Sequence, residues 1–210
     1  MTTPIADPET NPFTANRELA IFQTNIAKEW LRRSNNSSDI FAQFYFYFTA
    51  FNALYFVWSM LRQFDEYKAK LKDIEKVNST PPGSRIIGEV RQIAFLLSQL
   101  AAHQQNELIQ SLQPEIEYFL NRRALNDMGK RNARQREGNS DEGKAANEQL
   151  RESASCLIGL GRIIYLMRCN LVHGSKGGGE TDQDLIEVGV KVLREIVPIT
   201  ISLTEEKYCL

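Results

Sequence analysis

Apolar residues recur along most of this chain at spacings of three and four, the period of an α-helix with one buried side. No segment shows the strict apolar–polar alternation of a half-buried strand. The chain is therefore predicted to be all-α, an antiparallel bundle of four to five core helices. The pattern predicts helices over 17–33, 40–76, 84–102, about 140–172, and 182–203. It continues over 108–120, where Pro114 suits the first turn of a further short helix.

The segment from Ile40 to Leu61 is the most apolar of these and carries no charged residue. Its length would suit a transmembrane span. However, it holds ten of the chain's twenty aromatic residues, with tyrosines spread through its middle rather than at its two ends. We therefore interpret it as a helix buried on nearly all sides at the centre of the bundle, with Asn52 as a buried amide and no membrane association. Ser38 or Asp39 can cap its start.

Two stretches depart from the helical pattern. Residues 1–16 hold three prolines among polar residues and lack the basic start and apolar core of a signal peptide, so they are interpreted as a loose tail. Residues 121–144 hold three glycines and a run of arginines and lysines without apolar periodicity, which predicts a long exposed basic loop. Residues 17–210 are predicted to form one helical domain that carries this loop as an insertion.

Composition narrows the function classes. The net charge is −1, so the molecule as a whole does not attract nucleic acid, and any such contact must come from a local basic patch. The three cysteines are odd in number, and their spacing matches no metal site. Free thiols in a reducing compartment are the simplest interpretation, and we expect a cytoplasmic protein without metal or cofactor.

Candidate chemistry gathers at the end of the helix predicted over 140–172. Arg168, Asn170 and His173 fall in its last turns, and a glycine-rich loop with Lys176 follows. The negative end of the helix dipole favours the charged form of a histidine at this position. A histidine that titrates near neutral pH beside an arginine suits phosphodiester chemistry. The histidine moves a proton, and the arginine stabilises charge that develops on the phosphoryl oxygens.

One copy of this Arg–His pair is awkwardly placed for catalysis. A helix turns about 100° and rises about 1.5 Å per residue, so five residues put the two Cβ atoms about 140° apart around the axis and about 7.5 Å along it. The two side chains therefore do not stack. A structural alternative stays open, in which Arg168 pairs with an acid such as Asp184 and His173 caps the helix.

The string from Arg168 to Gly174, Arg-Cys-Asn-Leu-Val-His-Gly, resembles the Arg-x4–6-His motif of the HEPN domain family. It is most similar to an Apea-like branch, in which a lysine- and glycine-bearing loop and a helix starting Asp-x-x-Leu follow, here from Asp182 to Leu185. The segment from Phe48 to Tyr55 is also similar to the buried early helix of that branch. These stretches cover about a quarter of the chain, and the all-helical layout fits the rest.

The resemblance implies a helical bundle that forms homodimers and, in many members, a metal-independent endoribonuclease. In those members the RNA 2′-OH attacks its own phosphate in a cleft where Arg and His of two protomers converge, which would remove the difficulty of a single copy. By this resemblance, His173 is the acid/base group, Arg168 the phosphate clamp and Asn170 a polar orienter. Lys176, and from the basic run Arg131 and Arg134, would contact RNA phosphates. A loop that only aids solubility is the alternative for that run.

The sequence departs from the family pattern at two positions. Cys169 stands where many active members have a polar residue, and Ser175 stands where toxins of the nucleotidyltransferase-paired branch have a modifiable Tyr. The expected function is an RNA-cleaving toxin or a component of stress or phage defence, with RNA and an antitoxin or other partner protein as its contacts. Non-catalytic HEPN domains also exist, so the alternative is a helical module that binds RNA or a protein. A structural helical protein without a ligand is the third hypothesis.

Overall fold

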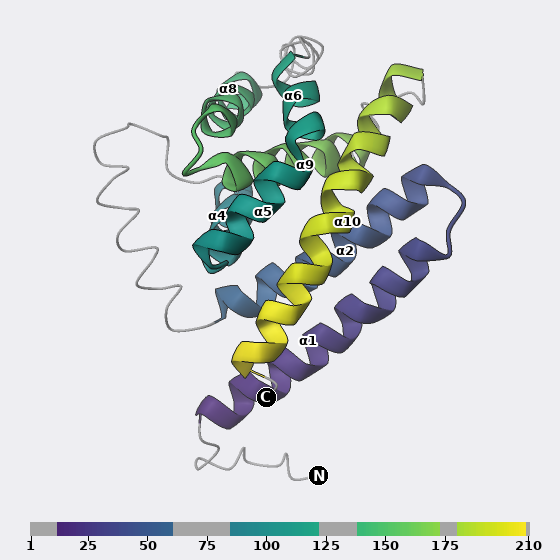
Figure 1. Ribbon diagram of the computed structural model, residues 1–210. Coiled ribbons are helices and arrows are strands. Elements are labelled where there is room, and N and C mark those ends of the chain that lie inside the picture. Colours follow the sequence, from purple (N-terminus) through teal and green to yellow (C-terminus); the bar gives the residue numbers. More distant parts are fainter. Residues whose placement is uncertain (1–11, 61–84, 122–137, 173–179, 209–210) are drawn as a thin grey trace.

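The structure is a computed structural model of the 210-residue chain, and it describes residues 12–60, 85–121, 138–172 and 180–208. These residues form helices and contain no strand, which confirms the predicted all-α fold class (Figure 1). Eight helices lie in the described part of the chain. They form two groups, a long three-helix layer and a cluster of shorter helices at one end of it (Figure 1).

The long layer consists of α1 (Pro12–Asn35), α2 (Ile40–Ser59) and α10 (Glu180–Tyr208). α1 and α2 form an antiparallel hairpin, and α10 packs along both of them (Figure 1). Asp39 caps α2, as predicted, because its carboxylate accepts from the backbone N–H groups of Phe41 at 2.9 Å and Ala42 at 3.5 Å. α1 begins five residues before its predicted start at 17, and the predicted continuation of α2 beyond Met60 lies outside the described residues.

Shorter helices form the second group. α9 crosses this group and packs against α4 and α8, while α4 also packs against α2 (Figure 1). This arrangement places the end of α9, the motif helix, between the cluster and the long layer. The members are α4 (Arg85–Ser98), α5 (Ala102–Ser111), α6 (Gln113–Asn121), α8 (Gly138–Arg151) and α9 (Cys156–Val172).

The single helix predicted over about 140–172 is wrong, because α8 and α9 are separate helices. A turn at 152–155 divides them, in which the Ser155 hydroxyl donates to the backbone oxygen of Gln149 at 3.0 Å and so ends the α8 ladder. α8 begins at Gly138, so the last seven residues of the predicted basic loop 121–144 are helical. Residues 122–137 of that loop lie outside the described residues.

α2 is the centre of the core. Its aromatic side faces α10 and α4, and Trp58 donates from Nε1 to the hydroxyl of buried Thr204 on α10 at 3.0 Å. The prediction that α2 is buried on nearly all sides is wrong, because α1, α4 and α10 leave one stripe of it open. Asn52 lies on that stripe and is exposed, so its assignment as a buried amide is wrong. The largest buried side chains of α2 are Phe44, Tyr47, Phe51, Leu54, Tyr55 and Trp58.

By length and composition alone, α2 is apolar enough to cross a membrane. Half of its apolar stretch is buried against the other helices of the fold. A core helix of a soluble protein meets the same criteria, so length and composition do not decide between the two environments.

Candidate functional site

Two glycines allow α9 to approach its neighbours closely. A Cβ on Gly159 would lie 2.7 Å from the backbone nitrogen of Leu150 on α8. A Cβ on Gly161 would lie 2.5 Å from Cγ2 of Ile93 on α4. Both distances are shorter than side chains tolerate, so glycine is required for this packing. The tightly packed first half of α9 thereby fixes the direction of its last turns, which carry Arg168.

Arg168 lies in the seam between α9 and α2. Its guanidinium carbon is 5.7 Å from the centre of the Phe48 ring, a cation–π contact. Phe48 is itself held edge-on by Tyr55, with ring centres 6.4 Å apart. Arg168 is partly buried. A partly buried cation loses part of its hydration, and polar or π partners must compensate for that loss. The groups near Arg168 therefore form part of the site.

Glu89 of α4 supplies the negative charge of this region. It lies one turn from Ile93, which faces Gly161, while Tyr165 lies one turn beyond Gly161 on α9. The charge of Glu89 acts on both Tyr165 and Arg168. Oε2 of Glu89 is buried and has no hydrogen-bond partner among the described residues, and the same holds for the hydroxyl of Tyr55. Tyr55, Glu89, Tyr165 and Arg168 are called the polar cluster here, because the charge of Glu89 acts on the other three.

Burial and neighbouring groups shift the pKa values of Tyr55, Tyr165 and Arg168. Burial raises the pKa of the Tyr55 hydroxyl, and the charge of Glu89 raises it further. Burial, a hydrogen bond with Cys169 and the charge of Glu89 all raise the pKa of Tyr165. Burial lowers the pKa of Arg168, but a hydrogen bond with Cys169 and the charges of Cys169 and Glu89 outweigh it, and the pKa is raised. At neutral pH the site therefore holds two neutral tyrosines and a permanent cation.

The cluster bears on the structural alternative for Arg168. That alternative pairs Arg168 with an acid such as Asp184, which is exposed on α10. The carboxylate whose charge acts on Arg168 is instead that of Glu89 on α4. Arg168 thus contacts α2 through Phe48 and feels the charge of Glu89 on α4, and no ion pair joins it to Asp184 within the described residues.

The structure places the predicted site residues unequally. Arg168 is described in full, and Asn170 lies in the last turn of α9 with its side chain outside the described residues. The separation of Arg168 and His173 stays a prediction, as do the roles of the other residues. The predicted residues outside the described part of the chain are His173, Lys176, Arg131 and Arg134.

Sequence reasoning missed the neighbours of Arg168. Glu89 lies four residues before Ile93 and seven before Leu96, so its carboxylate falls on the buried stripe of α4. A lone acid in register with an apolar stripe is a signal that can be read without a structure. Tyr165 lies three residues before Arg168, on the same side of α9. The position of Tyr55 near Arg168 could be found only from the structure, because Tyr55 lies on α2 and Arg168 on α9.

Two of the three cysteines are described, and both are free thiols. Cys156 is buried, which raises its pKa, and Cys169 is partly exposed beside Arg168. Within the described ranges no three His, Cys, Asp or Glu side chains lie together as metal ligands would. The structure thus offers a polar site around a cation.

Known proteins give no further guide to this site. Searches of protein-family models, of curated proteins and of solved structures find no match to the chain. The all-α fold class rests on the structure, and the HEPN resemblance rests on the motif residues alone.

Proposed function

We propose that this chain is a HEPN-type, metal-independent endoribonuclease. The observation that supports the proposal most is the placement of Arg168. It is a permanent cation near the end of α9 and lies over the ring of Phe48, and His173 follows it five residues later in the sequence. A fixed cation and a histidine that reach the same phosphate are what phosphodiester cleavage without a metal requires.

The reaction is an internal transfer within RNA. The 2′-OH attacks the adjacent phosphorus, the bond from phosphorus to the 5′-oxygen breaks, and the products are a 2′,3′-cyclic phosphate and a free 5′-OH. His173 accepts the proton of the 2′-OH, and a second histidine or the same one donates a proton to the leaving oxygen. Arg168 stabilises the negative charge that builds up on the phosphoryl oxygens.

Other predicted residues have supporting roles in this proposal. Asn170 orients the reacting groups, and Lys176, Arg131 and Arg134 bind RNA phosphates along the strand. Because ideal helix geometry predicts that Arg168 and His173 of one copy are spread apart, two chains supply the complete site in this proposal. We place the protein in the cytoplasm as a toxin or a component of stress or phage defence, restrained by an antitoxin or another partner protein.

A cleavage assay in EDTA tests the reaction class. Single-stranded and hairpin RNAs, labelled at the 5′ end, should be cut by the wild-type chain and leave cyclic phosphates. The His173→Ala variant should lose at least about a hundredfold in rate, since it lacks the proton-transfer group. Arg194→Ala is the matched control, because Arg194 is exposed on α10. Cleavage that persists in His173→Ala would reject the mechanism.

A non-catalytic binding module is the second candidate, and the exposed apolar stripe on α2 favours it. Such a stripe suits contact with another protein. This candidate predicts intact RNA after long incubation together with saturable binding of RNA or of a protein. Its RNA affinity should fall steeply with salt if phosphates carry the contact.

A further inference from the structure

Cys169 is a nucleophile that the proposed cleavage mechanism leaves unused. It lies in the last turn of α9, directly after Arg168, and its thiol is free and partly exposed. Cys156 begins the same helix, and its thiol is free but buried. A thiol reacts with a dissolved molecule only where that molecule can reach the sulfur. Of the two described cysteines, Cys169 is therefore the one open to chemistry.

Cys169 adjoins the polar cluster. Hydrogen bonds link its sulfur to Tyr165, one turn earlier on α9, and to the guanidinium of Arg168. The same guanidinium lies 5.7 Å from the centre of the Phe48 ring, and Phe48 meets the ring of Tyr55 edge-on at 6.4 Å. Phe48 therefore joins Tyr55 on α2 to the groups around Cys169 on α9.

Tyr55 gives a second, independent indication that a ligand atom belongs here. Its side chain is 1% exposed, and its hydroxyl has no hydrogen-bond partner among the described residues. The charges of Glu89, Arg168 and Cys169 all act on this hydroxyl, so it faces the same group of side chains. A buried hydroxyl without a partner has given up its hydration for nothing in return. An oxygen atom added to the sulfur of Cys169 would supply the missing acceptor.

We propose that Cys169 is a modification site for hydroperoxides, which oxidise its thiol to a sulfenic acid. The sulfur attacks one oxygen of hydrogen peroxide, so that a sulfur–oxygen bond forms and the oxygen–oxygen bond breaks. The leaving hydroxide takes the thiol proton and departs as water. The sulfur is oxidised by two electrons, and the peroxide is reduced by them. Arg168 stabilises the negative charge on the leaving oxygen, and the Tyr55 hydroxyl donates to the oxygen that stays on the sulfur.

The other described cysteine cannot convert this product into a disulfide. Positions 156 and 169 are thirteen residues apart on one helix, which separates them by about 20 Å along its axis. A disulfide requires Cα atoms within about 7 Å of each other. The sulfenic acid therefore persists with respect to Cys156, and an added thiol such as glutathione reduces it.

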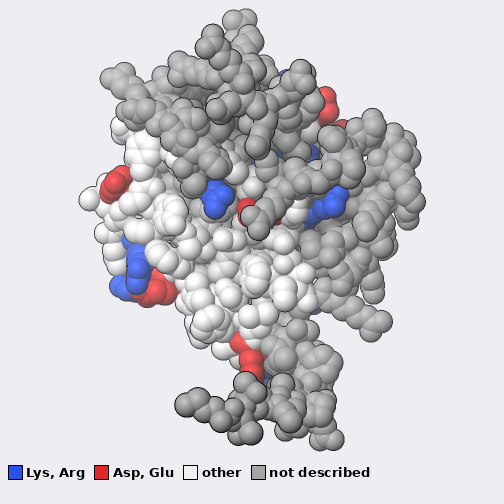
Figure 2. All heavy atoms as spheres, turned by 180° about the vertical axis from the view of Figure 1, so that it is seen from behind, with Lys and Arg blue, Asp and Glu red and all other residues white. Residues whose placement is uncertain are grey.

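The charge of the surface favours a small, neutral oxidant. From behind the view of Figure 1, uncharged side chains form a broad area in the middle of the molecule, and the charges of the described residues are scattered around it (Figure 2). A surface of this kind does not concentrate an anionic or a cationic reactant. Hydrogen peroxide is neutral and needs no such attraction, so it has only to reach the partly exposed sulfur.

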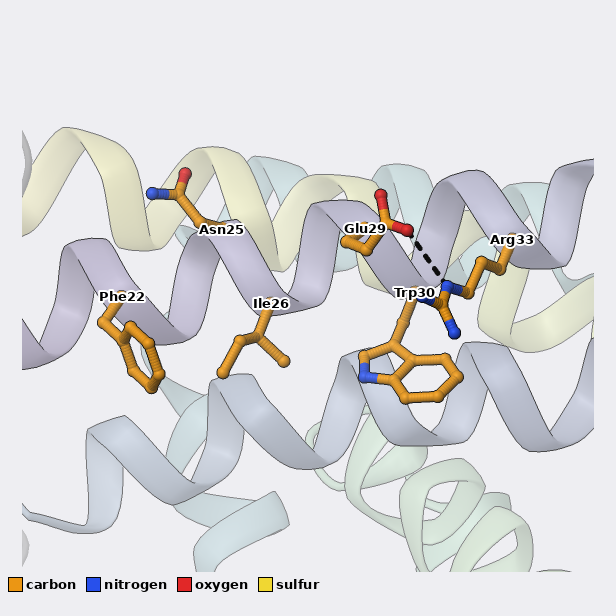
Figure 3. Close-up of a pocket in the computed structure, with 6 residues that line it drawn as sticks. All are labelled: Phe22, Asn25, Ile26, Glu29, Trp30 and Arg33. Carbon is orange, nitrogen blue, oxygen red and sulfur yellow. Dashed lines mark hydrogen bonds and ion pairs between the residues drawn. The ribbon is translucent and has the colours of Figure 1, made fainter.

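The groove along α1 is a larger hollow, but it lacks this chemistry. It has a volume of about 320 Å³ and is lined by Phe22, Asn25, Ile26, Glu29, Trp30 and Arg33 (Figure 3). Glu29 accepts from Arg33 at 3.0 Å, and the Arg33 guanidinium lies 4.8 Å from the centre of the Trp30 ring. No thiol lines the groove, and its two charged side chains are paired with each other. The reactive group of the described surface is therefore at the end of α9.

Oxidation of Cys169 would slow the proposed RNA cleavage, and this consequence rests on the proposed function. The added oxygen accepts a hydrogen bond from the guanidinium of Arg168. It thereby occupies donors that would otherwise stabilise the phosphoryl oxygens in the transition state. The modification itself requires only the thiol, the peroxide and the groups around them, and does not depend on RNA.

Trapping with dimedone tests the modification site. The reduced full chain is exposed to hydrogen peroxide together with dimedone, which bonds to a sulfenic sulfur with loss of water. Peptide mass spectrometry then locates the adduct, which should form at Cys169 and not at Cys156. In Arg168→Ala the adduct should form at least about tenfold more slowly, since the leaving oxygen loses its cation.

A pair of matched variants isolates the Tyr55 hydroxyl. Tyr55→Phe and Tyr47→Phe each remove one buried hydroxyl from α2, but the hydroxyl of Tyr47 donates to Asn35 at 2.7 Å. In excess peroxide without dimedone, Tyr55→Phe should pass from sulfenic to sulfinic acid at least about threefold faster than wild type. Tyr47→Phe should match wild type. Circular dichroism verifies that each variant is folded.

No adduct at Cys169, or an equal adduct at Cys156, would overturn the proposal. So would wild-type rates in both folded Arg168→Ala and folded Tyr55→Phe, because Cys169 would then react as any exposed thiol does. Cleavage assays on the same samples separate the two proposals. A chain that is labelled at Cys169 but cuts no RNA rejects only the ribonuclease, and a chain that cuts RNA but takes no label rejects only the modification site.

Discussion

Two buried tyrosine hydroxyls on α2 have opposite surroundings. The hydroxyl of Tyr47 donates to the side-chain oxygen of Asn35 at 2.7 Å, whereas that of Tyr55 has no hydrogen-bond partner among the described residues. Tyr47→Phe should lower the free energy of unfolding by about 1 kcal/mol, because it leaves the Asn35 oxygen without its donor. Tyr55→Phe should leave it unchanged or raise it. Urea unfolding followed by tryptophan fluorescence measures both, and equal losses would contradict the assignment.

The raised pKa of Tyr55 makes a separate prediction about alkaline pH. Its ordinary pKa is 10.0, and burial followed by the charge of Glu89 raises it in the folded chain. The resulting stability is fully present below about pH 10 and is lost as pH rises, because the unfolded chain ionises first. Above that pH, unfolding free energy should fall less steeply for Tyr55→Phe than for wild type, by up to about 1.4 kcal/mol per pH unit. Identical slopes would show that Tyr55 ionises in the folded state.

Within the proposed function, Glu89 is a positioning residue, because its charge acts on Arg168. If the proposed function holds, Glu89→Gln should lower kcat about tenfold, since the variant removes the negative charge that acts on the guanidinium. KM should stay the same or fall, because the variant removes a negative charge near the RNA phosphates. Steady-state kinetics gives this split, with the exposed Glu195→Gln on α10 as control. A rise in KM with unchanged kcat would contradict the positioning role.

Close helix packing accounts for the direction of α9. Gly159 faces the backbone of Leu150 and Ala146, so a Cβ there has nowhere to go. We expect Gly159→Ala to cost about 2 kcal/mol or more of stability through overpacking. Gly88 on α4 is exposed, and a Cβ there meets nothing within 4 Å. Gly88→Ala should therefore stabilise by about 0.5–1 kcal/mol, as it does in open helix positions. Thermal melts of both variants provide the comparison, and a harmless Gly159→Ala would reject the close approach.

Periodicity was enough to predict the helices but not their partners. The cap at Asp39 and the all-α class follow from local signals, which is why both predictions were confirmed. The division between α8 and α9 was missed, because apolar residues continue at helical spacing through the turn. That turn is closed by a local bond from Ser155 to Gln149, and the approach of Gly159 to α8 packs the two helices together. Neither contact leaves a signal in the apolar periodicity.

In the whole molecule, one long layer and one cluster of shorter helices meet at the end of α9 (Figure 1). The sequence marked Arg168 as the cation of a site. It could not supply the neighbours, because Phe48, Tyr55 and Glu89 come from two other helices and converge only when the bundle forms. The open stripe of α2 was likewise hidden, since a fully apolar helix gives no sign of which side is left uncovered.

The rate of RNA cleavage by Arg168→Ala tests the central claim most directly. Single-turnover cleavage in EDTA should fall at least about a hundredfold relative to wild type, since in the proposed mechanism Arg168 supplies the charge that stabilises the transition state. Arg194→Ala should cleave at the wild-type rate, and circular dichroism should show both variants folded. Wild-type cleavage by folded Arg168→Ala, or no cleavage of any RNA by the wild-type chain, would contradict the account.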